Sequence, residues 1–216
     1  QEPKVKEILS EEARQKKSRI YDISEDNLNF KEKAGKYIDF LNVNAYDKER
    51  DVRTNIAGEF QKSNLAAALQ TAELICGRLD EDKIYEALSQ IRISGRMEEI
   101  APGIIVDVSH NIQGMQGFVQ TVEANYHGMK KRILFAASHQ NEEEYMKNIL
   151  KTIPEIEAFY TVGIHKRRID EAEFQDAFRK MIDRNQETTV CFVVGSFYLA
   201  GMAKEFINQE EENVRL

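Results

Sequence analysis

The stretch that decides the fold is Ile104-Ile105-Val106-Asp107-Val108-Ser109-His110-Asn111. Its first three residues form a continuous β-branched run, the pattern of a parallel strand buried on both faces. Asn111 is a good N-cap for the amphipathic segment that follows, residues 112–126. In an open α/β sheet, ligands bind outside the carboxyl ends of the strands. We therefore expect Asp107 and His110 at a functional edge, beside a helix N-terminus that favours anions.

Strands and helices alternate along the rest of the chain. Apolar runs bounded by turn residues predict strands at residues 103–108, 132–137, 158–162 and 188–194. Amphipathic segments predict helices at residues 112–126, 141–153, 170–184 and 196–208, and the tail from residue 210 is expected to fray. Two helices open with the capping boxes Asn141-x-x-Glu144 and Asp170-x-x-Glu173. This alternation predicts an α/β fold with a Rossmann-like, mostly parallel sheet and helices on both faces.

The first 95 residues follow a different pattern. Apolar spacing predicts helices at residues 3–17, 64–77 and 80–91, with Asp80 as an N-cap and Gly77 ending the helix before it. Short strands are predicted at residues 18–23, 35–41 and 51–56, the last two as an antiparallel pair. Because no complete α/β repeat is present here, we expect residues 1–95 to be the incomplete α+β end of a larger domain. Residues 96–216 are expected to form a complete domain.

Composition and charge restrict the class of protein. The chain has 216 residues, is 42% hydrophobic and carries a formal net charge of −7. This content suffices for a packed core. The acidic balance argues against nucleic acid as a partner, because phosphate binding needs a clustered basic surface. No apolar run approaches the roughly 20 residues of a membrane span, and the start lacks a signal-peptide pattern.

The two cysteines and the first residue bear on the origin of the chain. Cys76 and Cys191 lie in a predicted helix and a predicted strand. We interpret both as reduced thiols in the core, so a cytoplasmic location is expected. The chain begins with Gln1 and not with Met, so we expect a processed product or an excised piece of a longer protein.

Four short motifs occur in one order along most of the chain. They are Gly58-Glu59-Phe60-Gln61-Lys62-Ser63-Asn64, Gly95-Arg96-Met97-Glu98, Asp107-Val108-Ser109-His110-Asn111 and Val194-Gly195-Ser196-Phe197-Tyr198-Leu199-Ala200-Gly201. In that order they resemble the G-x-H-Q-x-x-N, P-G-R-L-E, D-G-A-H-N-P and G-S-L-Y-L-x-G motifs of the folylpolyglutamate synthase and dihydrofolate synthase family, in the Mur ligase superfamily. The resemblance implies the C-terminal portion of such a ligase. It would contain the tail of the central ATP-binding domain and a complete glutamate-ligase domain.

The motifs also depart from the family pattern. Phe60 stands where the family has histidine, Val108 where it has glycine, and Ile112 where it has proline. After the strand at residues 132–137, Ser138-His139-Gln140-Asn141 stands where the family often has an acidic D-K-D. The nucleotide-binding part of the resemblance is mostly kept, whereas the details of substrate binding are left open.

The resemblance implies an ATP-dependent ligase reaction with ATP and Mg²⁺ as cofactors. ATP would phosphorylate a carboxylate of folate or dihydropteroate, and the amino group of L-glutamate would attack the acyl phosphate. Phosphorylation gives a poor electrophile a leaving group, so the enzyme chiefly positions the reactants and neutralises charge.

A phosphate-binding loop is missing from the sequence. Gly35-Lys36 is followed by Tyr37 and lacks the earlier glycine of a loop ending in Gly-Lys-Ser/Thr, and no G-x-G-x-x-G occurs. The family carries its phosphate loop and its Mg²⁺ ligands in the N-terminal part of the full-length protein. We therefore expect this chain to be inactive alone.

Four residues are candidates for nucleotide binding. Arg96 offers a planar fork of donors to phosphate, and the resemblance implies that it reaches the ATP γ-phosphate across the domain cleft. The resemblance also implies that Asp107 contacts the ribose and that Asn64, with Gln61 at the same helix start, contacts adenine. The alternatives are a solvated linker arginine, a strand-end aspartate that caps the next turn, and polar helix caps.

His110 is the candidate for a catalytic role beside Arg96. Imidazole donates or shuttles a proton near about pH 7. His110, with Ser109 beside it, would position the incoming amino acid or stabilise the region of the acyl phosphate. The alternative is a structural histidine whose hydrogen bonds are satisfied.

A further substrate-binding candidate comes from spacing alone. His139 and His165 follow predicted strands, so three of the four histidines lie just past carboxyl ends. Lys166-Arg167-Arg168 comes directly after His165. We hypothesise an electropositive edge where His139 and Lys166 face an anionic substrate, such as glutamate or a polyglutamate tail. The alternative is a solvated basic loop, and no histidine spacing indicates a metal site made by this chain alone.

Two other functions stay open. The first is a Mur-type ligase that adds an amino acid to a peptidoglycan precursor, although the ending Phe197-Tyr198-Leu199-Ala200-Gly201 favours the folate branch. The second is a stand-alone, non-catalytic binding module. We expect a monomer, while the sequence leaves the pterin preference and the length of the glutamate chain open.

Overall fold

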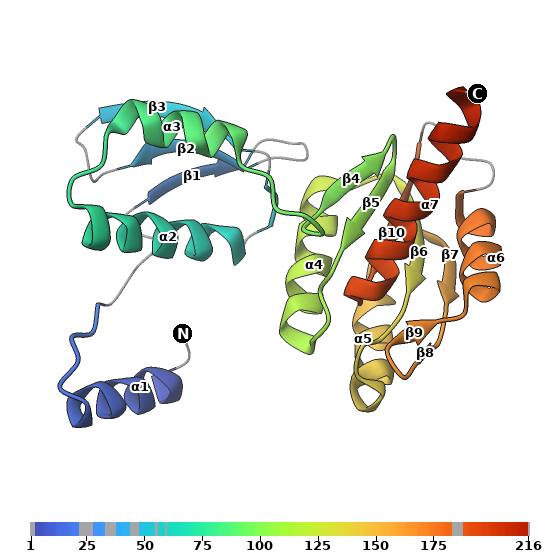
Figure 1. Cartoon of the computed structure of the whole chain (residues 1–216), viewed down its shortest axis with the longest axis horizontal. Helices are drawn as coiled ribbons and strands as arrows, with labels where there is room; N and C mark the ends of the chain where they lie inside the picture. Colours follow the sequence, from blue (N-terminus) through green and yellow to red (C-terminus); the bar gives the residue numbers. More distant parts are fainter. Residues whose placement is uncertain are drawn as a thin grey trace.

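The computed structural model describes residues 3–21, 28–32, 38–43, 48–54, 56–58, 60–182 and 188–215. Its elements form an N-terminal part, residues 3–90, and a C-terminal part, residues 98–215, joined by a linker at residues 91–97 (Figure 1). Among these described residues, no helix is both long and apolar enough to cross a membrane.

A five-stranded sheet forms the centre of the C-terminal part. Across the sheet, the strands are β4 (Glu98–Ala101), β5 (Ile104–Asp107), β10 (Thr189–Val194), β6 (Lys130–Phe135) and β7 (Ile156–Thr161). The last four run parallel, and β4 pairs antiparallel with β5. Every residue of β5 and β10 is buried, as a continuous β-branched run predicts. The predicted α/β fold with a mostly parallel sheet is therefore confirmed.

Helices cover both faces of this sheet. They are α4 (Ile112–Asn125), α5 (Glu143–Leu150), α6 (Glu171–Ile182) and α7 (Phe197–Arg215). Ile105 of β5 belongs to an apolar cluster with α4 and α5, whereas its neighbour Val106 belongs to a second cluster with α6 and α7. Successive side chains of a strand point to opposite faces, so one short strand contributes to both clusters.

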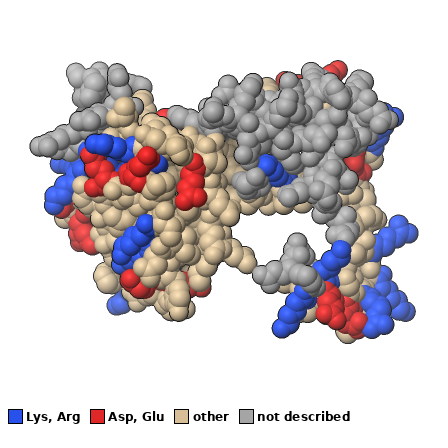
Figure 2. All heavy atoms as spheres, turned by 180° about the vertical axis from the view of Figure 1, so that it is seen from behind, with Lys and Arg blue, Asp and Glu red and all other residues tan. Residues whose placement is uncertain are grey.

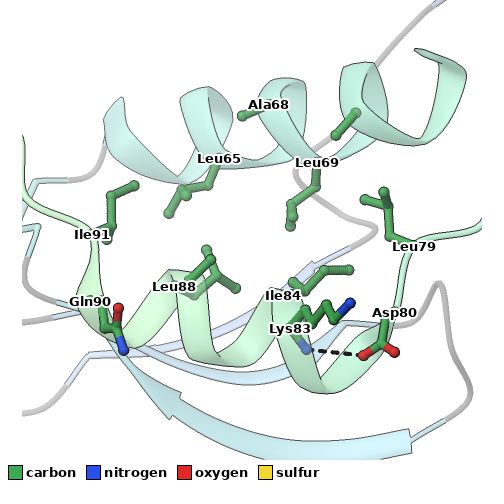
Figure 3. Close-up of a pocket in the computed structure, with 12 residues that line it drawn as sticks. Leu65, Ala68, Leu69, Leu79, Asp80, Lys83, Ile84, Leu88, Gln90 and Ile91 are labelled. Atoms are coloured by element: carbon green, nitrogen blue, oxygen red, sulfur yellow. Dashed lines mark hydrogen bonds between the residues drawn. The ribbon is translucent and has the colours of Figure 1, made fainter. Parts of the chain in front are cut away.

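The N-terminal part combines a small sheet with three helices. Its elements are α1 (Pro3–Gln15), β1 (Leu28–Glu32), β2 (Ile38–Val43), β3 (Lys48–Arg53), α2 (Phe60–Cys76) and α3 (Glu81–Gln90). The three strands form an antiparallel sheet in sequence order. Leu65 of α2 packs with Ile84 and Leu88 of α3. A groove of about 590 Å³ remains between the two helices, lined mainly by their apolar side chains (Figure 3).

Helix caps were predicted with mixed success. Asp80, Asn111 and Asp170 accept the backbone N–H three residues later, at 3.1, 2.7 and 2.9 Å, so these helix starts are confirmed. Gly77 follows α2 with φ of 77°, as expected of a residue that ends a helix. The capping box at Asn141 is wrong, because a 3₁₀ turn, η3 (Gln140–Glu142), precedes α5 and no side chain caps either start.

Some strands and ends differ from the predictions. The sequence pattern missed β1, β4 and a two-residue hairpin, β8 (Ile164–His165) with β9 (Arg168–Ile169). No strand forms at residues 18–21, and residues 22–23 and 35–37 lie outside the described residues. The predicted fraying from residue 210 is wrong, because α7 continues to Arg215.

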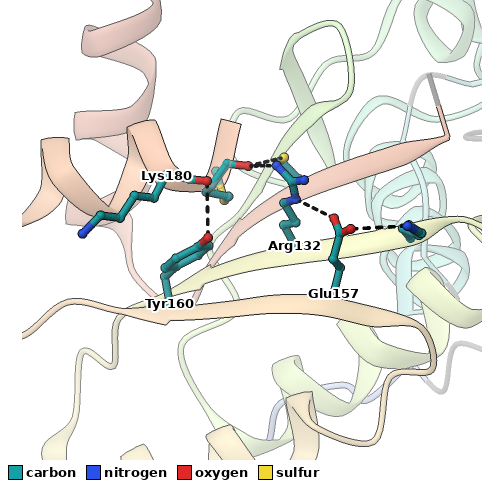
Figure 4. A network of polar contacts seen from close by, with 7 residues as sticks. Arg132, Glu157, Tyr160 and Lys180 are labelled. Carbon is teal, nitrogen blue, oxygen red and sulfur yellow. Dashed lines mark hydrogen bonds and ion pairs between the residues drawn. The ribbon is translucent and has the colours of Figure 1, made fainter. Parts of the chain in front are cut away.

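A polar network holds the C-terminal end of α6 against the sheet (Figure 4). Arg132 of β6 donates from Nε to Glu157 of β7 (2.8 Å) and from Nη1 to the carbonyl of Met181 (3.0 Å). The Tyr160 hydroxyl donates to the carbonyl of Lys180 (3.3 Å). The last carbonyls of a helix have no partner within the helix, so these side chains satisfy groups that would otherwise need water. The Arg132 guanidinium also holds the pKa of Glu157 below its ordinary value.

The two cysteines have different surroundings, and neither forms a disulfide. Cys191 in β10 is buried, and burial raises the pKa of its thiol to about 11. Cys76 is exposed at the end of α2, where Leu74 and Ile75 are also exposed, because this last turn extends beyond the contacts with α3. The expectation of a core thiol is confirmed for Cys191 and wrong for Cys76.

Gly195, between β10 and α7, provides a test of the fold. It has φ of +107°, and a methyl group there would lie 2.5 Å from the carbonyl oxygen of Ala136. We expect Gly195→Ala to lower the free energy of unfolding by about 3 kcal/mol, since it adds a backbone clash to the strain of a positive φ. Urea denaturation measures this change.

Gly128 is the matched control, because its φ is +75° and a methyl group there meets no atom within 4 Å. Gly128→Ala is expected to cost only about 1 kcal/mol, the cost of the positive φ alone. Equal destabilisation by the two substitutions would show that the close approach at Gly195 is unimportant.

Candidate functional site

The linker enters the C-terminal part through a tight turn at residues 95–97. Gly95 and Met97 both have positive φ, 71° and 46°. The carbonyl of Gly95 accepts a hydrogen bond from the N–H of Val108 at 2.8 Å, and a methyl group at Gly95 would lie 2.7 Å from Cγ1 of Val108. A glycine is therefore required for the linker to lie so close to the end of β5. Arg96 sits at the centre of this turn.

The buried carboxylate of Asp107 stabilises this turn through hydrogen bonds. Its side chain is 1% exposed. Oδ1 accepts hydrogen bonds from the N–H (2.8 Å) and the hydroxyl (2.6 Å) of Ser109, and Oδ2 accepts one from the N–H of Met97 (3.0 Å). Burial raises the pKa of Asp107, while these hydrogen bonds and the charge of Arg96 oppose the rise. The carboxylate thus fixes the position of Arg96, and its predicted contact with ribose stays a prediction.

A second anchor joins the linker to α7. Lys204 of α7 contacts both Glu98 Oε2 and the hydroxyl of Ser94 at 2.6 Å. The same carboxylate oxygen accepts the N–H of Gly95 at 2.5 Å. Burial alone would raise the pKa of Glu98, but Lys204 and the Gly95 N–H outweigh it and leave that pKa below its ordinary value. The turn is therefore held by groups from β5 and from α7.

His110 stands at the carboxyl end of β5, directly before α4. Its Nδ1 lies 3.0 Å from the carbonyl of Val108, which can only accept, so Nδ1 carries a proton and Nε2 is left for a ligand. The ring lies 5.4 Å from the ring of Phe197 at the start of α7. Oδ1 of the N-cap Asn111 accepts a hydrogen bond from the N–H of Gly114. Other N–H groups in the first turn of α4 therefore stay available to an anion.

The start of α2 brings two amides together. Asn64 donates from Nδ2 to Oε1 of Gln61 at 2.9 Å. Gln61 is buried, with 2% of its surface exposed, whereas Asn64 is exposed. Because Nδ2 has a second hydrogen and Oδ1 accepts, Asn64 keeps both a donor and an acceptor for a ligand. Gln61 therefore orients the amide of Asn64.

A pocket of about 270 Å³ lies where the two parts of the chain meet. Its lining residues are Phe60, Asn64, Arg96, Ser109, His110, Asn111, Gln113 and Gly114. The structure thus brings together four of the predicted site residues. Asp107 and Gln61 lie behind them as buried supports. Phe60, Asn111, Gln113 and Gly114 were not predicted as site residues, and Asn111 was predicted only as the N-cap of α4. The signal in the sequence for Gly114 was its place in the first turn of the predicted helix.

His139 and Lys166 do not line this pocket. Lys166 and Arg167 form the turn of the β8–β9 hairpin, with φ of 48° and 65°, a conformation that costs side-chain-bearing residues energy. Lys166, Arg167 and Arg168 are exposed. In Figure 1 the hairpin lies near the end of β7. The predicted residues Asn64, Arg96, Ser109 and His110 therefore share a pocket to which His139 and Lys166 do not belong.

Surface charge elsewhere on the C-terminal part is mixed. On the face in Figure 2, Lys and Arg lie among Asp and Glu. Several cations of the C-terminal part are paired, for example Lys147 with Glu143 and Lys180 with Asp176, both at 2.6 Å. The described residues contain no group of three or more His, Cys, Asp or Glu side chains that could hold a metal ion.

The fold matches solved structures of one family. No protein-family profile matches the sequence. No curated protein matches it either. Folylpolyglutamate synthase from Lactobacillus casei, without ligand, matches 95% of this chain with a TM-score of 0.71 and 17% identity. A folylpolyglutamate synthase bound to AMPPCP and folate matches 95% of this chain with a TM-score of 0.71 and 18% identity. The enzyme from Thermotoga maritima matches 96% with a TM-score of 0.67 and 21% identity.

The chain spans about half the length of these proteins: 50%, 51% and 52% of them are covered, respectively. At this level of identity, the likeness establishes a shared fold. The resemblance in sequence motifs is thus joined by a match in fold over nearly the whole chain.

Asp107 gives the site a pH dependence that can be measured. Its folded pKa lies above the ordinary 3.8, so protonation favours the folded state. We expect its contribution to stability to be complete below that value and to be lost as the pH rises through the folded pKa. Urea denaturation of the parent and of Asp107→Asn, from about pH 3 to about pH 7, isolates this contribution because asparagine does not titrate. A stability difference that stays constant over this range would contradict the burial argument.

Proposed function

We propose that this chain is part of an ATP-dependent ligase that joins an amino acid to a carboxylate through an acyl phosphate, as in folylpolyglutamate synthase. The acceptor would be a folate or dihydropteroate, and the incoming amino acid L-glutamate. The observation that carries the proposal is the pocket between the two parts, where Asn64, Arg96 and His110 meet. The shared fold, and the motifs that supply these residues, support it.

The residues of the pocket fit the chemical groups of ATP. The free donor and acceptor of Asn64 suit adenine, and the Arg96 guanidinium suits a phosphate. Bound ATP supplies the phosphoryl group that activates the acceptor. Arg96, held by Asp107, would neutralise charge at that group without having to reorganise. Mg²⁺ ligands are expected in a part of the protein beyond this chain, where the resemblance puts the phosphate loop.

His110 is proposed to orient the amino acid. With the Nδ1 proton donated to the carbonyl of Val108, Nε2 of the neutral ring can accept a proton from the ammonium group of glutamate, and once protonated it can donate to a carboxylate. Ser109 lies beside it, with its hydroxyl committed to Asp107 as a donor, so its oxygen can still accept. The hydrogen bonds that already fix these two side chains support both proposed roles.

The N-terminal part is proposed to be the end of a larger ATP-binding domain. The apolar groove between α2 and α3 supports this, as do Leu74 and Ile75, which are 49% and 77% exposed. Apolar surface of this kind is normally covered by another element. The alternative of a stand-alone binding module would leave it facing water. The chain alone is expected to show no ligase turnover.

Arg96 provides the principal test, in the natural polypeptide that joins this sequence to an ATP-binding half. We expect glutamate-dependent ADP release with a folate acceptor, and a loss of about a hundredfold in kcat for Arg96→Ala. Arg96→Lys is expected to keep part of the activity, since it retains charge without the planar fork. Steady-state kinetics measures both.

Arg92 is the matched control for this substitution. It lies in the same linker, is exposed, and donates at 3.3 Å to the neighbouring carbonyl of Ile91. Arg92→Ala should leave kcat unchanged. Full turnover by Arg96→Ala would remove the basis of the proposed mechanism, and turnover with a peptidoglycan precursor in place of folate would reassign the acceptor.

The basic hairpin is proposed as a secondary contact for an anionic substrate. Lys166, Arg167 and Arg168 make no ion pair or side-chain hydrogen bond with the described residues. Replacing all three with glutamine is expected to raise the glutamate KM about fivefold, the equivalent of roughly 1 kcal/mol of ionic attraction. The control neutralises three exposed cations elsewhere, Lys17, Arg19 and Lys151. An unchanged glutamate KM in the hairpin variant would eliminate this contact.

A further inference from the structure

Phe60, the first residue of α2, lies where the two parts of the chain meet. A methyl group at Gly117, in the middle of α4, would lie 3.1 Å from its Cδ1. A methyl group at Gly58 would lie 2.7 Å from its Cε1 and 3.1 Å from Oγ1 of Thr121, also on α4. The aromatic ring is therefore packed between Gly58 and the centre of α4.

The contact with Phe60 explains why Gly117, in the middle of α4, is a glycine. Glycine inside a helix is less favourable than alanine, so its presence needs a reason in packing. Gly117 is bare where the Phe60 ring approaches, whereas Gly201 in α7 meets no atom within 4 Å. The Phe60 ring thus packs in the space that a side chain at Gly117 would take.

Phe60 also touches the pocket. It lines the pocket together with Asn64, one helical turn later on α2, and Arg96, whose guanidinium carbon lies 6.0 Å from the centre of the ring. On the other side, the pocket is lined by the first turn of α4. One ring therefore connects the helix that carries Asn64, the linker that carries Arg96 and the helix that follows His110.

We propose that Phe60 is a positioning residue: a wedge that sets the spacing between α2 and α4 and so holds Asn64, Arg96 and His110 at the separation that the nucleotide requires. The wedge acts through the placement of other side chains and not through contact with reacting atoms. Its effect on catalysis rests on the proposed function, whereas its effect on the arrangement of the two parts does not.

The first test measures that arrangement in the 216-residue chain. Cys76 is exposed on α2 and Cys191 is buried, so a donor and an acceptor dye can be attached at Cys76 and at an introduced Lys151→Cys on the C-terminal part. Single-molecule energy transfer then reports the distance between the parts. We expect Phe60→Ala and Gly117→Ala to shift or broaden the distribution, and Gly201→Ala, the same substitution in open space, to leave it as in the parent.

The second test measures ATP affinity in the natural ligase. Gly117→Ala is expected to raise the KM for ATP about fivefold or more, because groups misplaced at a site lose much of their effect. A role limited to folding would lower the active fraction, and hence kcat, with KM unchanged. The double variant with Phe60→Ala should bind ATP no worse than Phe60→Ala alone, because the three atoms nearest to the added methyl group all belong to the Phe60 ring.

The outcomes separate the two proposals. Identical distance distributions for Gly117→Ala and Gly201→Ala, or additive losses in the double variant, would overturn the wedge. Altered distances in a protein without ligase turnover would support the wedge and overturn the proposed function. Ligase turnover together with unaltered distances in every variant would support the proposed function and overturn the wedge.

Discussion

The candidate site depends on one buried carboxylate. Asp107 ends the buried strand β5, and its two oxygens accept hydrogen bonds from segments on either side of that strand in sequence: from Ser109 after the strand, and from Met97 in the linker. Burying this group is costly, as the raised pKa shows, and its three hydrogen bonds offset that cost. Without it, a turn with two positive φ angles would lose the side chain that bonds Met97 to the end of β5, and would keep its bond from Gly95 to Val108 and the contacts of the linker with α7.

The pocket is assembled from segments that are distant in sequence. The start of α2 supplies Asn64, the linker supplies Arg96, and the end of β5 supplies His110. Each is fixed by its own neighbour: Gln61 orients Asn64, Asp107 holds the turn of Arg96, and the carbonyl of Val108 sets the ring of His110. The arrangement is preorganised, because hydrogen bonds to neighbouring residues fix the orientation of these groups before a ligand binds.

Much of the fold was predictable, because its signals are local. The apolar run of β5 and the cap at Asn111 are read from adjacent residues, and both are confirmed. The edge strand β4 was not predictable, because Glu98 and Glu99 give it no strand pattern, and it exists through pairing with β5. The capping box at Asn141 failed because a 3₁₀ turn takes its place.

The candidate site was likewise predictable only in part. Its polar residues could be predicted from short sequence motifs, whereas the contacts that position them join residues far apart in the sequence. The pairing of Glu98 with Lys204 crosses 106 residues, and no local pattern announces it. The role of Phe60 depends on the missing side chain of Gly117, 57 residues later. The hint in the sequence was Gly117 itself, a glycine in the interior of a predicted helix, where close packing of another group is a common reason for it.

The two anchors of the linker also determine which part of the molecule Arg96 moves with. Gly95 is bonded to Val108, Met97 to Asp107, and Glu98 begins a strand of the sheet. Any swing of one part against the other must therefore occur before Gly95, and the guanidinium travels with the C-terminal part as a rigid attachment. A change in the angle between the two parts would therefore change the distance between Arg96 and Asn64, which line the same pocket. The geometry of the pocket is thus tied, through this attachment, to the orientation of one part relative to the other.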